Sequence, residues 1–308
     1  MQKTFSFKVS DKLKEELLEH FQDKKRDKTP QYALFQANEE DTIVTLYESN
    51  KIVFQGISSD IDYDYWKQKE YILTGKYPEE KEKKEEKKDN RDYYFTSAIG
   101  SDEVGTGDYF GPIVVTSSYV NKKDLNFLEN LGVKDSKKLN DEKIIKIAPE
   151  LIKNIKHKTI VLNNKDYNDN YSKDFNMNKI KAILHNKVLL ELIKEDLEYD
   201  YIIVDQFAKE RTYYSYLKDS KSIAKNITFL TKAEEKNLAV AVASIISRYI
   251  FLKEMKRISN ELNITIPKGA SNLVDDIGKK ILLEKGEKTL YNIVKLNFKN
   301  TQKIKDLL

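Results

Sequence analysis

The sequence lacks cysteine and holds only three histidines among its 308 residues. The absence of cysteine excludes a disulfide framework and any thiolate metal site, and three histidines leave little scope for a zinc triad. Oxygen ligands are therefore the expected metal chemistry. The first ten residues contain no apolar signal-peptide core, and the longest apolar stretch, residues 238–246, is about half as long as a membrane span. These absences predict a cytoplasmic protein with no membrane partner.

Composition and charge predict two domains joined by a linker. The length allows one or two domains, and the apolar content of 40% is ample for packed cores. Residues 77–92 are almost entirely charged and show no apolar periodicity, so we expect a linker between a first domain, residues 1–76, and a second domain, residues 93–308. The net charge is +4, and its positive excess lies in the second domain, as polyanion binding requires.

The first domain is predicted to be a small α+β unit. Four segments alternate polar and apolar residues as strands do: 4–9, 32–37, 42–48 and 52–57. Ser10 or Asp11 caps an expected helix over residues 12–21. Four aromatic residues could form a sheet face that stacks on nucleic acid, or could pack in the core: Phe5, Phe7, Tyr47 and Phe54.

The segment of greatest chemical interest is residues 99–112, which reads Ile-Gly-Ser-Asp-Glu-Val-Gly-Thr-Gly-Asp-Tyr-Phe-Gly-Pro. A strand is expected near residues 93–101, so Asp102 lies near a strand end and Glu103 turns to the other face. Carboxylates are hard ligands for Mg²⁺, and glycines let a backbone approach a sugar or phosphate closely. We therefore expect a metal and a polyanion to share one site.

Two simpler explanations of this segment compete with a metal site. An Asp-Glu pair before glycine is often an ordinary polar turn. The glycine spacing G-x-G-x-x-x-G also differs from the dinucleotide fingerprint, and no Gly-Lys-Ser/Thr of a P-loop follows. Because a carboxylate pair would repel a phosphate unless a cation lay between them, a metal-bridged site is the preferred interpretation.

A third carboxylate is expected to join this pair. Alternating elements follow the linker: strands at residues 113–120 and 157–162, helices at 178–195 and 238–261, and a buried strand at 201–204. Asp205 directly follows the buried strand. Since ligands gather at strand ends in open α/β sheets, Asp205 is predicted to meet Asp102 and Glu103 in space. His185 is expected to pack within its helix.

The segment from Asp102 to Pro112 resembles the first signature of the type 2 ribonuclease H family. Its Gly-Thr-Gly-Asp-Tyr-Phe-Gly-Pro continuation is similar to the ribonuclease HIII branch, whereas ribonuclease HII usually has Gly-Arg-Gly. Further matching blocks follow in the family's order: residues 132–139, 204–207, 231–236, 243–249 and 267–270. The resemblance implies an α/β fold, a ribonuclease H-like mixed five-stranded sheet with flanking helices, preceded by a TATA-binding-protein-like N-terminal domain.

The same resemblance implies an activity and its residues. It implies a monomeric endoribonuclease that hydrolyses the RNA strand of RNA/DNA hybrids, with two Mg²⁺ or Mn²⁺ ions per site. By this resemblance Asp102, Glu103 and Asp205 are metal ligands, and Glu210 is the candidate for the fourth catalytic acid, although Lys209 stands near the expected position. The residues expected to bind substrate through backbone groups, hydroxyls or ammonium groups are Gly105, Thr106, Gly107, Ser136, Lys137, Lys138 and Lys232.

Two other functions stay open at this point. A ribonuclease HII-like enzyme would cleave at single ribonucleotides embedded in DNA. A catalytically inactive hybrid-binding module is also compatible with an unassigned fourth acid, and would bind hybrids without forming product.

Overall fold

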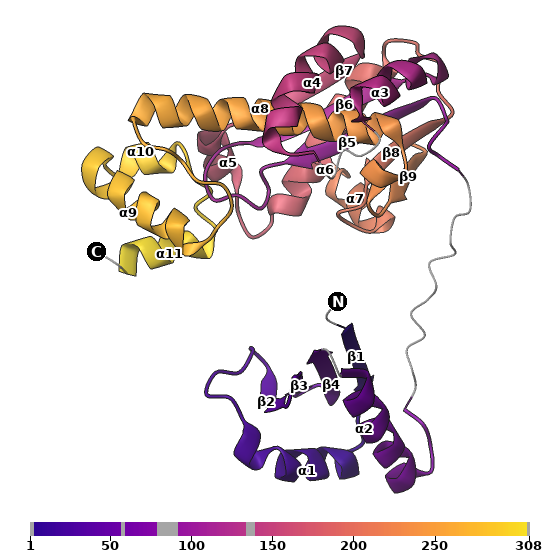
Figure 1. Ribbon diagram of the computed structural model, residues 1–308, viewed down its shortest axis with the longest axis vertical. Helices are drawn as coiled ribbons and strands as arrows, with labels where there is room; N and C mark the ends of the chain where they lie inside the picture. The colour runs from indigo at the N-terminus through magenta and orange to yellow at the C-terminus, as the bar shows by residue number, and fades with distance from the viewer. Residues whose placement is uncertain (1–2, 57–58, 79–91, 134–138, 307–308) are drawn as a thin grey trace. The chain divides into compact units, whose positions relative to one another are not determined.

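The computed structural model describes residues 3–56, 59–78, 92–133 and 139–306 (Figure 1). The chain forms two compact units, residues 1–90 and 91–308. Most of the charged stretch at 77–92 lies outside the described residues. The domain limits at 76 and 92 therefore stay a prediction.

The N-terminal unit is a four-stranded antiparallel sheet packed against two helices. Its elements are β1 (Lys3–Lys8), α1 (Asp11–His20), η1 (Gln22–Lys24), β2 (Ala33–Glu39), β3 (Thr42–Tyr47), β4 (Lys51–Gly56) and α2 (Ser59–Thr74), and the strand order is β1-β4-β3-β2. The side chain of Ser10 accepts a hydrogen bond from the backbone N–H of Leu13, which caps α1. The α+β character is as predicted, and α2 is an additional helix.

Two of the four aromatic residues singled out in the sequence, Phe7 and Phe54, belong to the core of this unit. Phe5, Phe7 and Phe54 surround the ring of Tyr63 on α2, with centroid distances of 5.2, 5.6 and 6.3 Å. Phe7 and Phe54 therefore pack in the core, whereas Phe5 is half-buried beside Tyr63. Tyr47 is half-buried.

The second unit is built on a mixed five-stranded sheet in the order β7-β6-β5-β8-β9. Its strands are β5 (Ala98–Val104), β6 (Ile113–Val120), β7 (His157–Leu162), β8 (Tyr201–Asp205) and β9 (Ile227–Leu230). β6 runs antiparallel to β5 and β7, whereas β8 runs parallel to β5 and β9. This is the ribonuclease H-like arrangement that the sequence predicted.

Helices cover both faces of this sheet. Ala98 of β5 packs in a core with α8 (Leu238–Leu262) and α4 (Asp141–Asn154), while its neighbour Ile99 packs with α6 (Met177–Ile193) and α7 (Glu210–Tyr216). Successive side chains of a strand point to opposite faces, so the two helix layers lie on opposite sides, with α8 running along the sheet in Figure 1. A Cβ at Gly100 would lie 2.3 Å from the backbone nitrogen of Val240, so glycine is required for the close approach of α8.

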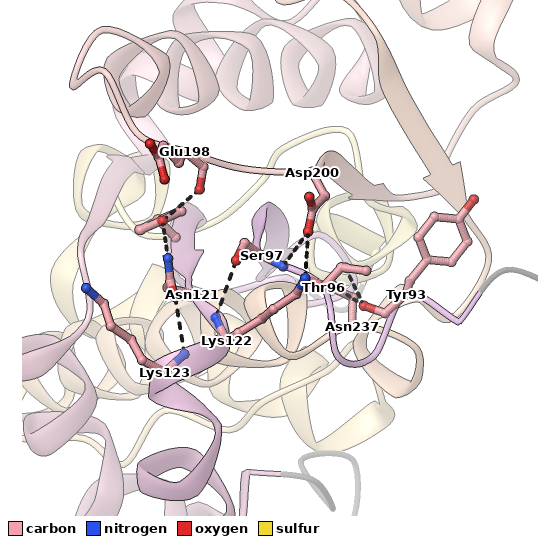
Figure 2. A network of polar contacts seen from close by, with 10 residues as sticks. Tyr93, Thr96, Ser97, Asn121, Lys122, Lys123, Glu198, Asp200 and Asn237 are labelled. Atoms are coloured by element: carbon pink, nitrogen blue, oxygen red, sulfur yellow. Dashed lines mark hydrogen bonds and ion pairs between the residues drawn. The ribbon is translucent and has the colours of Figure 1, made fainter.

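The start of β5 differs from the prediction. Residues 93–97 form a turn, so β5 begins at Ala98. Figure 2 shows the polar contacts that hold this turn: the side chain of Asn237 donates to the carbonyl of Tyr93 at 2.8 Å, and the N–H of Ser97 donates to Asp200 at 3.1 Å. β5 also continues to Val104, beyond the predicted end at residue 101, so Asp102 lies within the last residues of the strand.

A C-terminal group of short helices holds the glycine-rich loop. α9 (Asn272–Lys285), α10 (Glu287–Tyr291) and α11 (Lys299–Asp306) share a core with Tyr109 and Phe110. Beside this core, the fully buried Lys295 donates to the carbonyl oxygens of Asp108 and Gly111 at 2.7 and 2.5 Å. The remaining helices are η2 (Lys122–Asp124), α3 (Leu125–Leu131), α5 (Asn164–Asn170) and η4 (Ala233–Glu235). Within the described segments, we find no helix with the length and apolarity needed to span a bilayer.

We predict that Lys295 makes stability depend on pH. Burial lowers the pKa of Lys295 to about 7, although the charge of Asp108 opposes the shift. Between pH 7 and the ordinary value of 10.5, the unfolded chain binds this proton more strongly than the folded chain does, so stability should increase as pH rises. Urea denaturation at pH 7 and pH 9 should show this increase in the wild type and a smaller one in Lys295→Met. Equal increases in both proteins would contradict the assignment.

Candidate active site

Two aspartates meet at the ends of neighbouring parallel strands. Ser101 of β5 pairs with Val204 of β8, so Asp102 and Asp205 follow in register on adjacent strands. Both line a cavity of about 220 Å³. The other residues that line it are Ile144, Glu234, Ser244, Ile245 and Arg248. Asp102 and Asp205 thus lie together in one cavity, as predicted.

Glu234 lines the same cavity, next to a residue whose backbone is hydrogen-bonded to one of these aspartates. The backbone N–H of Ala233 donates to Oδ1 of Asp205 at 2.8 Å. This bond fixes η4 beside the end of β8, and Glu234 is the next residue of η4. The cavity therefore contains carboxylates from three separate segments of the chain.

The carboxylate of Asp102 carries a large electrostatic penalty. Burial and, next, the charges of Glu103 and Asp205 raise the pKa of Asp102 to about 8, because hydrogen bonds from Ser244 and from the Glu103 N–H offset only part of the increase. A divalent cation in the cavity would remove this penalty, because it favours the ionised form of every carboxylate around it.

Glu103 lies on the opposite side of the strand, where two basic side chains of α6 hold it. Its carboxylate oxygens contact Nζ of Lys181 at 2.5 Å and Nε2 of His185 at 2.8 Å. Burial alone would raise the pKa of Glu103, but His185 and Lys181 outweigh burial and hold the pKa below its usual value. Glu103 therefore does not line the cavity that contains Asp102.

The contacts of His185 extend this buried arrangement. The hydroxyl of Ser101 donates to the carbonyl of Thr116 at 3.0 Å, so Nδ1 of His185 donates to Ser101 at 2.7 Å. The ring of Phe207 stacks on His185, and Nζ of Lys181 lies 4.2 Å from the same ring centroid. His185 is buried as expected, but sequence reasoning missed its contact with Glu103 and missed Lys181 altogether. The one available signal was their i, i+4 spacing, which places both on one face of a helix.

The structure places Glu210 away from the cavity. Glu210 is exposed in the first turn of α7, where the chain turns away from β8, and Lys209 is exposed beside it. Neither residue lines the cavity. Glu234, by contrast, lines the cavity, because β9 and η4 return the chain to Asp205.

The glycines after Glu103 have different structural requirements. Gly105 has a φ of +96°, and a Cβ there would lie 2.2 Å from the carbonyl oxygen of Pro112, so glycine is required. Gly107 is exposed, and a Cβ there would meet no atom within 4 Å. Packing does not explain a glycine at 107, whereas close approach of a ligand would.

Only some of the other residues predicted to bind substrate lie within the described part of the chain. Lys232 is exposed and directly precedes η4, with a φ of +54°. Thr106 is half-buried between the two glycines. Ser136, Lys137 and Lys138 lie outside the described residues.

The acidic side chains of the site differ in their fit to a metal ion. Among the residues that the structure places, no group of three histidine or acidic side chains is arranged as a ready cation site. One physical reason for this absence is that Lys181 and His185 hold Glu103 outside the cavity that contains Asp102. Asp102, Asp205 and Glu234 nevertheless supply the hard oxygen donors that Mg²⁺ and Mn²⁺ prefer, in one cavity.

Comparisons with known proteins show the family to which the chain belongs. Residues 99–301 match the family model described as Ribonuclease HII, and residues 4–76 match a domain of unknown function, DUF3378. Ribonuclease HIII of Geobacillus kaustophilus is 38% identical over 98% of each chain, and that of Bacillus subtilis is 42% identical over 90% of this chain and 89% of its own. This chain belongs to the ribonuclease HIII family.

Solved structures of ribonuclease HIII extend the similarity to the fold. Bst-RNase HIII in complex with Mn²⁺ matches with a TM-score of 0.69 and 36% identity over 99% of each chain. RNase H3 of Aquifex aeolicus matches with a TM-score of 0.54 and 25% identity over 95% of this chain and 99% of its own. The family and the fold class predicted from the sequence are confirmed.

We predict that Gly105 and Gly107 respond differently to alanine. Gly105→Ala should lower the Tm by about 2–8 °C, because a side chain at positive φ costs about 1–2 kcal/mol and 1 kcal/mol shifts Tm by about 2–4 °C in a domain of this size. Gly107→Ala should leave Tm unchanged and weaken hybrid binding. Calorimetry and binding measured on both variants check this, and a destabilised Gly107→Ala protein would contradict the ligand explanation.

Proposed function

We propose that this protein is an endoribonuclease that hydrolyses the RNA strand of RNA/DNA hybrids. The observation that carries the proposal is the convergence of Asp102, Asp205 and Glu234 in one cavity, in a chain of the ribonuclease HIII family. The glycine-rich loop continues directly from the strand that bears Asp102. A phosphodiester and its sugar would therefore meet carboxylates and exposed backbone groups together.

The proposed cofactor is a pair of Mg²⁺ or Mn²⁺ ions, and the similar Bst-RNase HIII is known in complex with Mn²⁺. Asp102 and Asp205 are the proposed ligands, with Glu234 in place of Glu210 as the fourth acid. Such ions supply an activated water and charge stabilisation on the leaving 3′-oxygen. Glu103, the other acid of the predicted set, would have to leave Lys181 and His185 to reach an ion held by Asp102.

The substrate is proposed to be held by backbone and basic groups. Gly105, Thr106 and Gly107 offer backbone groups that can distinguish a 2′-hydroxyl at close range. Lys232, beside η4, and the predicted set Ser136, Lys137 and Lys138 would contact phosphates. Phosphate contacts position the duplex, while the 2′-hydroxyl contact selects the RNA strand.

One gel experiment tests the proposed function. RNA/DNA hybrid, duplex RNA and duplex DNA are incubated with the protein, with and without Mg²⁺ or Mn²⁺, together with a DNA duplex that holds one ribonucleotide. Metal-dependent cleavage of the hybrid alone is the expected result. Cleavage mainly at the single ribonucleotide would favour ribonuclease HII-like activity, and tight hybrid binding without product would favour an inactive binding module.

We predict that Glu234→Gln impairs hydrolysis and that Glu210→Gln does not. Losing a metal-binding carboxylate weakens metal affinity, so Glu234→Gln should be inactive at low Mg²⁺ and partly rescued at high Mg²⁺ by mass action. Glu210→Gln removes the same charge from an exposed helix start and is the matched control. A Mg²⁺ titration of initial rates in both variants decides the question. The reverse pattern would restore Glu210 as the fourth acid.

The N-terminal unit is proposed to increase affinity for the hybrid by tethering, in a protein that works as a cytoplasmic monomer. We predict that removing residues 1–76 leaves a folded catalytic domain whose KM for hybrid rises while its kcat changes little, because the two units each have a core of their own. Circular dichroism and steady-state kinetics check this. An unfolded remainder or an unchanged KM would contradict it.

A further inference from the structure

An arginine at the cavity has its orientation fixed by a carboxylate from another helix. Arg248 is the one cation among the described residues that line the cavity with Asp102, Asp205 and Glu234. Its Nε and Nη2 donate to Oδ1 of Asp141 at 3.0 and 2.6 Å, and Nη1 donates to the carbonyl of Leu139 at 3.3 Å. The guanidinium is therefore oriented by three bonds to the start of α4.

The same carboxylate holds a second cation. The other oxygen of Asp141 accepts from Nζ of Lys268. Partial burial would raise the pKa of Asp141, but hydrogen bonds and charges from Lys268 and Arg248 hold the pKa below its usual value. Asp141 is thus ionised at neutral pH, and the Arg248–Asp141–Lys268 triad carries one net positive charge.

This triad connects the cavity to the glycine-rich loop. Lys268 directly precedes Gly269, whose N–H donates to Oδ1 of Asp108 at 2.6 Å and whose carbonyl accepts from the N–H of Tyr109 at 2.9 Å. Asp108 and Tyr109 directly follow Gly107 in the chain. A nucleic-acid strand in contact with both the cavity and the loop would pass the triad.

The ion pairs of Asp141 with Arg248 and Lys268 contribute little to the stability of the fold. The side chains of Arg248, Lys268 and Asp141 are 36%, 49% and 30% exposed, and ion pairs at such exposure contribute little, about 0–1 kcal/mol. Donors also remain: the guanidinium has five N–H groups and uses three, while the ammonium has three and uses one on Asp141. The remaining N–H groups suit phosphate oxygens.

We propose that Arg248 and Lys268 form a phosphate subsite that binds a backbone phosphate next to the scissile bond, with Asp141 as the positioning residue of both cations. The inference rests on the proposed function, since it takes a nucleic-acid strand as the ligand. The subsite offsets the repulsion that three cavity carboxylates exert on the incoming backbone. Asp141 contributes by orientation, although its own charge disfavours a polyanion.

Asp141 affects hybrid binding in two opposite ways, since its charge disfavours the polyanion while its hydrogen bonds orient the two cations. Binding measurements can separate these effects. Full-length protein is titrated with a fluorescent RNA/DNA hybrid in EDTA, which prevents hydrolysis, over a series of salt concentrations. Arg248→Gln and Lys268→Gln should each weaken binding and reduce the log Kd against log salt slope by about one unit, because each removes one phosphate contact. Unchanged slopes in both variants would overturn the subsite.

Asp141→Asn tests the positioning role against a matched control. Glu142→Gln removes the same charge at the neighbouring exposed position of α4. If charge alone mattered, both variants would bind hybrid slightly more tightly than the wild type. We expect Asp141→Asn to bind several-fold more weakly with a smaller salt slope, Glu142→Gln to bind at least as well as wild type, and Asp141→Glu to recover part of the slope. Equal behaviour of Asp141→Asn and Glu142→Gln would overturn the positioning role.

These outcomes are separate from the proposed catalysis. Binding in EDTA is measured without turnover, so the subsite is judged whether or not the wild type cleaves hybrids. A wild-type protein that binds hybrid with the predicted slopes but forms no product with Mg²⁺ would contradict the proposed function and support the subsite. Thermal unfolding of each variant confirms that the compared proteins are folded.

Discussion

The parallel pairing of β5 with β8 is the constraint on which the rest of the structure depends. It brings Asp102 and Asp205 together near the carboxyl ends of the two strands, because Ser101 and Val204 are in register. The pairing needs close cover from α8, which Gly100 permits. With α8 in place, Ser244 and Arg248 face the same cavity. Catalytic geometry and core packing therefore depend on the same few backbone contacts.

Strand alternation divides the acidic groups of the site into two environments. Asp102 faces a cavity with other carboxylates, and burial together with those charges raises its pKa. Glu103, the next residue, faces α6 and is neutralised there by Lys181 and His185. One side of β5 thus concentrates negative charge that a cation would relieve, and the other side already contains its own positive charges. Adjacent residues in one motif have different electrostatic roles.

Much of the second unit could be predicted from local pattern. Alternation and apolar runs predicted β6, β7, β8 and α8 closely, because each has a clear period and a clear end. The rule that ligands gather at strand ends in open α/β sheets predicted that Asp205 would lie near Asp102. β5 was placed too early, since the aromatic content of residues 93–97 suits a strand while Asn237 and Asp200 hold that segment in a turn.

The features of the site that could not be predicted from the sequence depend on contacts between distant segments. Glu234 was not identified because its place is set by the bond from Ala233 to Asp205, whereas Glu210 was chosen for its nearness in the chain. Lys181 has the ordinary appearance of a helix-surface lysine until α6 packs behind β5. The Arg248–Asp141–Lys268 triad likewise joins three segments that no local pattern connects.

We propose that the cavity between β5, β8 and η4 is a divalent-metal site. A crystal structure of the protein soaked in Mn²⁺, with the ion located by its anomalous scattering, would show whether an ion binds there. We expect Mn²⁺ bound by the carboxylates of Asp102 and Asp205, with Glu234 at the same ion or its neighbour. Mn²⁺ bound at Glu210, or no ion in the cavity at a concentration that supports hydrolysis, would contradict it.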